Sequence, residues 1–188
     1  MEQLLFIKNG VKDFYRVGAV APSSRFLAER MARATLPAGR QVSMNNDQTI
    51  VELGAGTGAI TKELLKILPT QGRLTILEIN PDFVSFLEKN FKDQRMVCYA
   101  KSAENLPKIF GKNSADAIVS SLPLGNFGTY YSKKIILGAK DCLKPNGIFV
   151  QFQYSLKSWR LLKKTFRQVN ICFEPRNIWP AFIYICRK

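Results

Sequence analysis

Histidine is absent from the 188 residues of this sequence, and cysteine occurs only four times. Without histidine the chain can use neither Ser-His nor Cys-His catalysis, and it lacks a principal zinc ligand. The cysteines, Cys98, Cys142, Cys172 and Cys186, form no CxxC pair. We therefore expect four reduced thiols in apolar strands and helices, and no metal site.

Long apolar runs are also missing. No stretch approaches the roughly 18–20 apolar residues that a membrane-spanning helix needs. Residues 1–10 hold too short an apolar stretch for a secretory signal, and Lys8 interrupts it. The length suits one domain, residues 1–188, and we expect a cytoplasmic monomer.

Acidic residues are half as frequent as basic ones, 14 against 28, which gives a formal net charge of +14. Such an excess in a small chain indicates a polyanionic partner, either nucleic acid or an anionic membrane surface. Composition alone does not choose between these two partners.

From residue 49 onward, short β-rich runs alternate with amphipathic segments. We expect strands at residues 49–53, 74–79, 96–100, 115–120, 148–154, 169–173 and 181–186. We expect helices at residues 59–68, 81–91, 131–143 and 156–166. The alternation predicts a parallel sheet with helices on both faces, and the last two strands predict an antiparallel hairpin. Residues 144–147 are predicted to form a turn in which Asn146 and Gly147 supply positive φ angles.

A helical unit, residues 1–48, precedes this core. Residues 4–17 can form an amphipathic helix that carries the bases Lys8, Lys12 and Arg16. The run Pro22-Ser23-Ser24 indicates the start of a second helix over residues 25–34. Residues 36–47 are polar and contain glycine, which predicts a loop.

The most informative motif is Gly54-Ala55-Gly56-Thr57-Gly58, which directly follows the strand that carries Glu52. Glycines allow a sharp turn and a close approach of a ligand, and ligands bind at the carboxyl ends of strands in open α/β sheets. The spacing from Gly54 to Ala59 also satisfies the dinucleotide fingerprint G-x-G-x-x-G/A. Dinucleotide sites and S-adenosylmethionine sites both use an acid such as Glu78, at the end of the second strand, for the ribose hydroxyls. The loop by itself leaves both kinds of cofactor open.

Taken with Glu52, Glu78 and the terminal hairpin, residues 49–188 resemble the class I methyltransferases. The resemblance implies a Rossmann-like α/β fold. Its features are a seven-stranded, mostly parallel sheet with an antiparallel C-terminal hairpin, helices on both faces and an N-terminal helical extension. The implied cofactor is S-adenosylmethionine, which leaves as S-adenosylhomocysteine.

The same resemblance implies a set of cofactor contacts. Glu52 and the loop glycines would hold the methionine part, Glu78 the ribose, and Ile79 the adenine face. Ser102 and Ala103 would lie at the adenine edge, although Ser102 stands where the family often has an acid. The full expected set is Ser23, Ser24, Glu52, Gly54, Ala55, Gly56, Gly58, Glu78, Ile79, Ser102, Ala103, Ser121 and Leu122.

Four islands resemble bacterial phospholipid N-methyltransferases more narrowly. They begin at Gly18, Val119, Gln151 and Arg176, and they include Pro22-Ser23-Ser24, Ser121-Leu122-Pro123-Leu124, Gln153-Tyr154 and Trp179-Pro180. In that family Ser23 and Ser24 would help to close the cofactor pocket. The implied acceptor is the amine of phosphatidylethanolamine.

That acceptor suggests roles for four further residues. Because a phospholipid amine is largely protonated at neutral pH, the site must desolvate it or accept its proton, and aromatic faces stabilise the cationic product. Tyr15 and Tyr154 are the candidate catalytic residues, and Trp179 is a further aromatic wall. Arg176 is the candidate for the lipid phosphate.

Two alternatives stay open. The ribosomal RNA adenine dimethyltransferases share the glycine loop and the Leu-Pro after the fourth strand, but they follow the proline with an aromatic residue that stacks on the flipped base. Here Leu124 follows Pro123, Ser121 replaces the usual amide, and the end at Lys188 leaves no room for an RNA-binding domain. The second alternative is a noncatalytic module with this fold that binds anionic surfaces.

Two basic amphipathic segments could reach a membrane. Residues 4–17 have the pattern of an interfacial helix. Residues 156–167 fit either an interfacial helix or an outer helix of the sheet with a charged face. We expect a peripheral position on the inner face of the cell membrane.

Overall fold

The computed structural model describes residues 23–36 and 47–188. They form a seven-stranded sheet of order β3-β2-β1-β4-β5-β7-β6, in which β7 runs antiparallel to both of its neighbours. The strands are β1 (Thr49–Leu53), β2 (Arg73–Glu78), β3 (Met96–Ala100), β4 (Ala115–Ser120), β5 (Leu143–Gln153), β6 (Gln168–Glu174) and β7 (Ala181–Arg187). The predicted sheet and terminal hairpin are confirmed.

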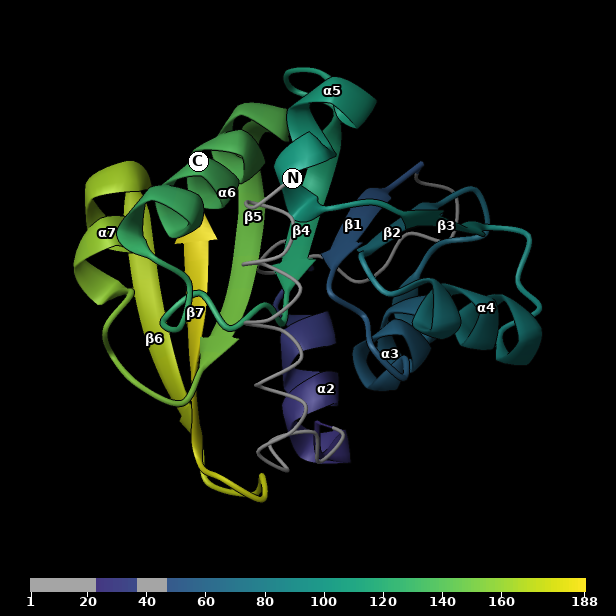
Figure 1. The fold of residues 1–188 in the computed structure, drawn as a ribbon, viewed down its shortest axis with the longest axis horizontal. Helices are drawn as coiled ribbons and strands as arrows, with labels where there is room; N and C mark the ends of the chain where they lie inside the picture. The colour runs from purple at the N-terminus through teal and green to yellow at the C-terminus, as the bar shows by residue number, and fades with distance from the viewer. Residues whose placement is uncertain (1–22, 37–46) are drawn as a thin grey trace.

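Helices cover both faces of this sheet (Figure 1). Those on one face are α2 (Arg25–Arg33), α3 (Ala59–Ile67) and α4 (Pro81–Asn90). Those on the other are α5 (Leu106–Phe110), α6 (Thr129–Cys142) and α7 (Trp159–Thr165), with the short 3-10 helix η1 (Ala103–Asn105) before α5. Along β1, Val51 and Leu53 join one core and Ile50 joins the other, so apolar side chains of this strand are buried on both faces of the sheet.

Side-chain caps set two of the predicted helix starts. The Ser24 hydroxyl accepts a hydrogen bond from the Leu27 N–H group at 3.2 Å and caps α2. Asn80 caps α4 in the same way, and Pro81 occupies the first helical position, where its missing N–H group costs nothing.

Two local predictions differ from the structure, and two short helices were missed. Residues 144–147 lie within β5, at an irregularity in its pairing with β4, and only Asn146 has a positive φ angle. Helix α7 begins at Trp159 instead of residue 156. The helical turns η1 and α5 were not predicted, because segments of three and five residues are too short to show a helical period.

The apolar side of α7 faces the sheet. Leu162 is fully buried and Phe166, which follows the helix, is 4% exposed in the core. Helix α7 is therefore an outer helix of the sheet, which was one of the two expectations for residues 156–167, and its apolar side packs in the core instead of forming an interfacial face. Residues 4–17, including Tyr15, lie outside the described residues, as does most of the loop predicted at 36–47. In the described ranges, no helix is both long and apolar enough to cross a bilayer.

Candidate cofactor and acceptor site

Three glycines shape the loop after β1. Gly54, Gly56 and Gly58 have φ angles of 74°, 54° and 83°, in the left-handed region that favours glycine. A Cβ atom at Gly54 would lie 2.7 Å from Leu122 Cδ2, and one at Gly58 would lie 2.6 Å from Phe91 Cε2. Both backbone conformation and close packing therefore require glycine at these two positions.

Glu52 is a buried acid, and one of its two carboxyl oxygens has no hydrogen-bond partner among the described residues. Its side chain is 1% exposed, and Oε2 accepts a hydrogen bond from the Thr61 hydroxyl at 2.7 Å. Oε1 is buried and has no partner among the described residues. Burial raises the pKa of Glu52 to about 7; the Thr61 hydroxyl opposes this shift, and the charge of Glu78 adds to it. A buried acid in this state fits a positively charged ligand.

Glu78, at the end of β2, anchors the glycine loop. Its Oε2 accepts a hydrogen bond from the Gly56 N–H group at 3.0 Å, and its Oε1 accepts one from the Asn80 N–H group at 2.9 Å. Each carboxylate oxygen keeps a second lone pair, so the group can also accept hydrogen bonds from hydroxyls. The carboxylate thus fixes the loop and has capacity left for a ribose.

The predicted adenine contacts lie at the same edge of the sheet. Glu78 is in register with Ala100 across the parallel β2–β3 pair, so Ile79 and Ser102 follow neighbouring strand ends. Ile79 is half-buried and Ala103 is buried. The Ser102 hydroxyl accepts a hydrogen bond from the Glu104 N–H group at 3.3 Å and caps η1, so it has a structural task of its own.

Ser121 joins the end of β4 to the glycine loop. Its N–H group donates to the Leu53 carbonyl at 3.1 Å, and its hydroxyl donates to the Gly54 carbonyl. The loop is consequently held from both sides, by Glu78 on β2 and by Ser121 after β4. This brings the predicted residues Ser121 and Leu122 beside the predicted loop.

Two buried glutamines of β5, which were not predicted as site residues, bind the backbone carbonyl of the residue after Ser121. The Leu122 carbonyl accepts hydrogen bonds from Gln151 Nε2 at 3.0 Å and Gln153 Nε2 at 2.9 Å. Gln153 Oε1 in turn accepts one from the Gly125 N–H group at 3.1 Å. A pair of glutamines inside an apolar strand was the signal in the sequence. Because both lone pairs of the Leu122 carbonyl are used, it has none left for an incoming amine.

Asn177 is a further residue that was not predicted as part of the site. Its Oδ1 accepts a hydrogen bond from the Ser24 N–H group at 2.8 Å. Its Nδ2 donates to the Trp179 carbonyl at 3.0 Å and to the Tyr154 hydroxyl at 3.5 Å. One amide therefore ties the start of α2, the end of β5 and the β6–β7 connection together, and it unites three predicted residues that are far apart in the sequence.

The rings of Tyr154 and Trp179 meet edge to face, with centroids 6.1 Å apart. Burial raises the pKa of Tyr154, and the hydrogen bond from Asn177 opposes the shift, so the phenol is neutral at neutral pH. Beside Tyr154 is a small cavity of about 50 Å³. Its lining consists of Ser121, Leu122, Pro123, Asn126, Phe152, Gln153, Tyr154 and Ser155. This cavity adjoins the end of β4, next to the glycine loop.

The predicted phosphate ligand Arg176 already has partners. Its Nε donates to Glu174 Oε1 at 3.0 Å, and its guanidinium lies 4.3 Å from the centre of the Phe26 ring. Arg30 Nη1 lies 3.3 Å from Glu174 Oε2. The hydrogen bond from Arg176 lowers the pKa of the buried Glu174 to about 2; burial opposes this and Arg30 assists it. Because the Arg176 side chain is still 60% exposed, a phosphate role stays a prediction.

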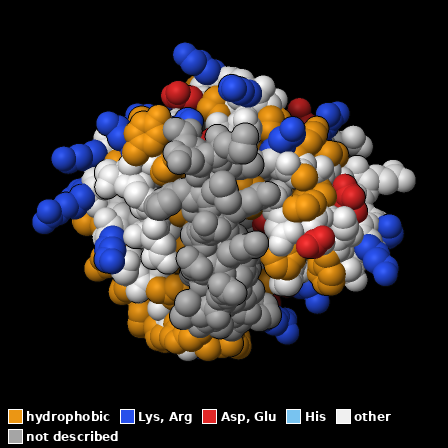
Figure 2. Space-filling view, in the orientation of Figure 1, with side chains coloured by type: hydrophobic (Ala, Val, Ile, Leu, Met, Phe, Trp, Pro, Cys, Tyr) orange, Lys and Arg blue, Asp and Glu red, His pale blue; other side chains and the backbone are white. Residues whose placement is uncertain are grey.

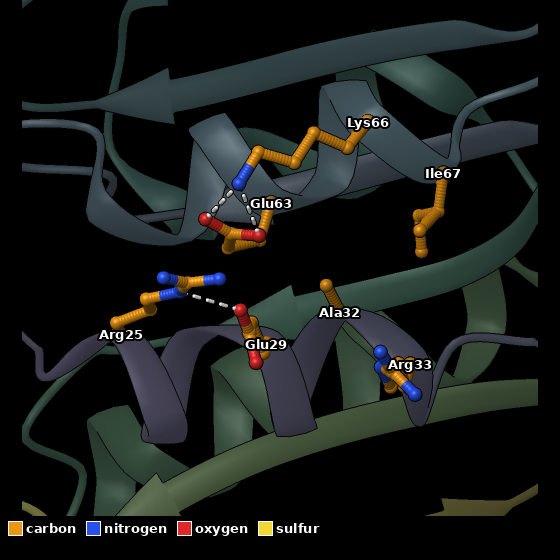
Figure 3. A pocket seen from close by; sticks show the side chains of 7 residues that line it. All are labelled: Arg25, Glu29, Ala32, Arg33, Glu63, Lys66 and Ile67. Carbon is orange, nitrogen blue, oxygen red and sulfur yellow. Dashed lines mark hydrogen bonds and ion pairs between the residues drawn. The ribbon is translucent and has the colours of Figure 1, made fainter.

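A larger hollow of about 260 Å³ lies elsewhere, between α2 and α3 (Figure 3). Arg25 and Glu29 pair across 2.7 Å on α2, and Lys66 and Glu63 pair across 2.6 Å on α3. None of the glycine-loop residues lines this hollow, and its charges are largely paired with one another. It is separate from the predicted cofactor site.

The glycine loop lies between the acids Glu52 and Glu78, on a sheet of order β3-β2-β1-β4-β5-β7-β6. Together these features are typical of one class of enzyme. The family model described as "Methyltransferase domain" matches residues 50–147. The chain belongs to the class I S-adenosylmethionine-dependent methyltransferases.

Two individual relatives differ in how much of this chain they match. An ornithine lipid N-methyltransferase of Singulisphaera acidiphila is 32% identical over 190 residues, which cover 97% of this chain and 94% of the relative. A ribosomal RNA small subunit methyltransferase A of Mycoplasma capricolum is 36% identical over only 55 residues, or 29% of this chain and 20% of the relative.

Among solved structures, a 1,6-didemethyltoxoflavin-N1-methyltransferase of Burkholderia thailandensis superimposes with a TM-score of 0.69. The match covers 100% of this chain and 89% of that one at 15% identity, so it shows the fold alone. The fold and the family predicted from the sequence are therefore confirmed. The individual contacts with cofactor and acceptor stay predictions.

Proposed function

We propose that this chain transfers a methyl group from S-adenosylmethionine to the primary amine of a lipid head group. The observation that carries the proposal is the relationship to an ornithine lipid N-methyltransferase along nearly the whole chain. The proposal includes action at the surface of the inner membrane by a peripheral, cytoplasmic protein.

The residues around the glycine loop fit the cofactor. S-adenosylmethionine would supply an electrophilic methyl group on a positively charged sulfur. The unpartnered Oε1 of Glu52 suits the cationic end of such a molecule, and Glu78 has lone pairs left for ribose hydroxyls. Gly54 and Gly58 leave the backbone free of the Cβ atoms that would crowd Leu122 and Phe91.

On the acceptor side, the chain must present a neutral amine. A primary amine has a pKa of ~10.4 in water, and only its neutral form attacks the methyl group. Tyr154 is a neutral phenol, so its oxygen would orient the amine by accepting a hydrogen bond, without acting as a phenolate base. The faces of Tyr154 and Trp179 would stabilise the methylated ammonium. Water in the cavity would take the proton.

One feature of the structure argues against the RNA alternative. Leu124, at the position where adenine methyltransferases place a stacking ring, is 2% exposed and belongs to the core. A flipped base needs an accessible aromatic face there. The cavity beside the glycine loop is therefore better suited to an aliphatic amine.

A label-transfer assay tests the proposal. The protein is incubated with radiolabelled S-adenosylmethionine and, in separate arms, phosphatidylethanolamine vesicles, ornithine lipid vesicles or unmethylated ribosomal particles. We expect label in a lipid arm, and the two lipid arms identify the acceptor: phosphatidylethanolamine, as expected from the sequence, or the ornithine lipid of the relative. Label in RNA alone would refute the proposal. The Glu78→Ala variant serves as the inactive control.

A further inference from the structure

Three apolar side chains are exposed around the β6–β7 connection. Phe26 of α2 is 45% exposed, Ile178 is 64% exposed and Trp179 is 44% exposed. We call these three residues the docking patch. Hydrophobic side chains gather along the lower edge of the molecule in Figure 2, at the end where the β6–β7 connection lies in Figure 1.

The structure holds the docking patch in place. The Asn177 side chain hydrogen-bonds to the Ser24 N–H group and to the Trp179 carbonyl. These two bonds attach the segment that carries Ile178 to the start of α2 and to the residue that follows Ile178. Arg176 bridges the patch, since it pairs with the buried Glu174 and lies over the Phe26 ring. A fixed turn that presents isoleucine and tryptophan to the outside has the character of an interaction site.

The docking patch is continuous with the acceptor cavity. The ring of Trp179 packs against that of Tyr154, and Tyr154 lines the cavity. A lipid amine stays attached to acyl chains in the bilayer, so it reaches the cavity only if the membrane surface lies at the cavity mouth. The docking patch, which adjoins the cavity through the contact of Trp179 with Tyr154, suits that position, since tryptophan prefers the membrane–water interface and apolar residues insert shallowly there.

Exposed cations flank the docking patch. The Arg25 side chain is 78% exposed and that of Arg176 is 60% exposed, in a chain with a formal net charge of +14. Each such cation is attracted to an anionic membrane surface, although less strongly when it is paired with a carboxylate. The charge is complementary to an anionic bilayer.

We infer that Phe26, Ile178 and Trp179 insert into the surface of an anionic bilayer and thereby place the acceptor cavity against the lipid head groups. This inference rests on the proposed function for its account of why the cavity must face a membrane. It differs from the membrane segments expected from the sequence, residues 4–17 and 156–167.

Vesicle sedimentation tests the inference on the full chain, with vesicles of phosphatidylglycerol and phosphatidylethanolamine. Ile178→Asp and Phe26→Asp should each weaken vesicle binding about tenfold, because each replaces an exposed apolar side chain that would insert into the bilayer with a negative charge. The matched control is Phe86→Asp on α4, because Phe86 is also 45% exposed but lies toward the other end of the sheet. That variant should bind vesicles within about twofold of the wild type. Circular dichroism checks that all three variants fold.

A second readout separates this inference from the proposed function. A short-chain lipid amine, dissolved as monomers, needs no docking, so Ile178→Asp should methylate it at the wild-type rate while losing activity on vesicles.

Vesicle binding by Ile178→Asp equal to that of the wild type overturns the inference and leaves the proposed function intact. Loss of vesicle binding in a protein that methylates no lipid supports the docking patch and refutes the function. A wild-type dimer that Ile178→Asp dissociates, measured by light scattering, also overturns the inference, because the patch would then join two copies of the chain.

Discussion

Two buried glutamates lie near the ends of strands in one sheet, and their surroundings differ. Glu174, the last residue of β6, is held by Arg30 and Arg176, and its pKa is lowered to about 2. Glu52, near the end of β1, has one hydrogen bond from Thr61 and an unpartnered oxygen, and its pKa is raised to about 7. The protein itself supplies two arginines to Glu174, whereas Glu52 has no cationic partner among the described residues.

This difference distinguishes a buried carboxylate that stabilises the fold from one that is suited to bind a cationic ligand. A carboxylate with its own arginines stabilises the fold, and here Glu174 joins α2 to the β6–β7 connection. A carboxylate that the fold leaves without a cation costs stability unless a ligand supplies the charge. The unpartnered oxygen of Glu52 beside the glycine loop therefore supports the proposed cofactor site, whereas Glu174 stabilises the β6–β7 connection next to the proposed acceptor site.

The largest effect is expected on the cofactor side from Glu78→Ala. The variant removes the anchor of Gly56 and the predicted acceptor for ribose hydroxyls together, so cofactor binding should fall more than about 100-fold, below detection by calorimetry. Glu88→Ala, an exposed acid on α4, is the control and should bind normally. Undiminished binding by Glu78→Ala would show that the cofactor site is misassigned.

The second prediction concerns pH and Glu52. Because the folded-state pKa of about 7 lies above the ordinary value of 4.5, the folded protein retains the proton longer than the unfolded chain. The stabilising contribution is complete below pH 4.5 and is lost as the pH rises through 7, by about 3 kcal/mol in the free energy of unfolding. Urea titrations of the cofactor-free protein across this range measure the loss. Glu52→Gln should remove it, and an equal pH dependence in that variant would rule out Glu52 as its source.

The third prediction applies one substitution to both glutamates. Glu174→Gln should destabilise the protein by about 2 kcal/mol, because it weakens the contacts with two arginines, while cofactor affinity stays within about twofold. Glu52→Gln at pH 8 should stabilise the cofactor-free protein, since it removes an uncompensated buried charge, and should weaken cofactor binding. Urea titration and calorimetry measure the two properties. Destabilisation by both variants at pH 8 would remove the distinction between the two carboxylates.

The smallest effect is expected at Asn177, which acts by positioning Tyr154 and Trp179. Asn177→Asp keeps the acceptor for the Ser24 N–H group but loses both donated hydrogen bonds, so kcat should fall about tenfold with an unchanged Kd for the cofactor. Asn170→Ala, an exposed asparagine on β6, is the control. A change in cofactor affinity with kcat unaffected would show that Asn177 serves the cofactor side.

The sequence predicted the strands and the glycine loop around the proposed cofactor site well, because these features are local. Gly54, Gly56 and Gly58 need special backbone conformations, and a glycine requirement of this kind is visible in one chain. Glu52 and Glu78 stand at fixed positions near strand ends, and the strands themselves are short apolar runs between clear turns. All seven strands were predicted with end differences of a few residues, apart from the longer β5.

The acceptor side could not be predicted to the same depth, because tertiary contacts assemble it. Asn177 meets Ser24 across 153 positions of the chain, and Gln151 and Gln153 reach a carbonyl about 30 residues away. Neither contact leaves a periodic pattern in the sequence. The same holds for Arg176, whose pairing with a buried glutamate depends on how the β6–β7 connection folds. Single residues such as Tyr154 and Trp179 were identified by resemblance, but their partners were not.

The most direct test of the acceptor is to locate the transferred methyl group. The protein is incubated with S-adenosylmethionine and mixed vesicles of phosphatidylethanolamine and ornithine lipid, and the extracted lipids are analysed by fragmentation mass spectrometry. We predict a methyl group on the head-group nitrogen of one of these lipids, absent when Glu78→Ala replaces the wild type. Methylation of RNA alone in a parallel incubation, with no lipid amine modified, would contradict the assignment.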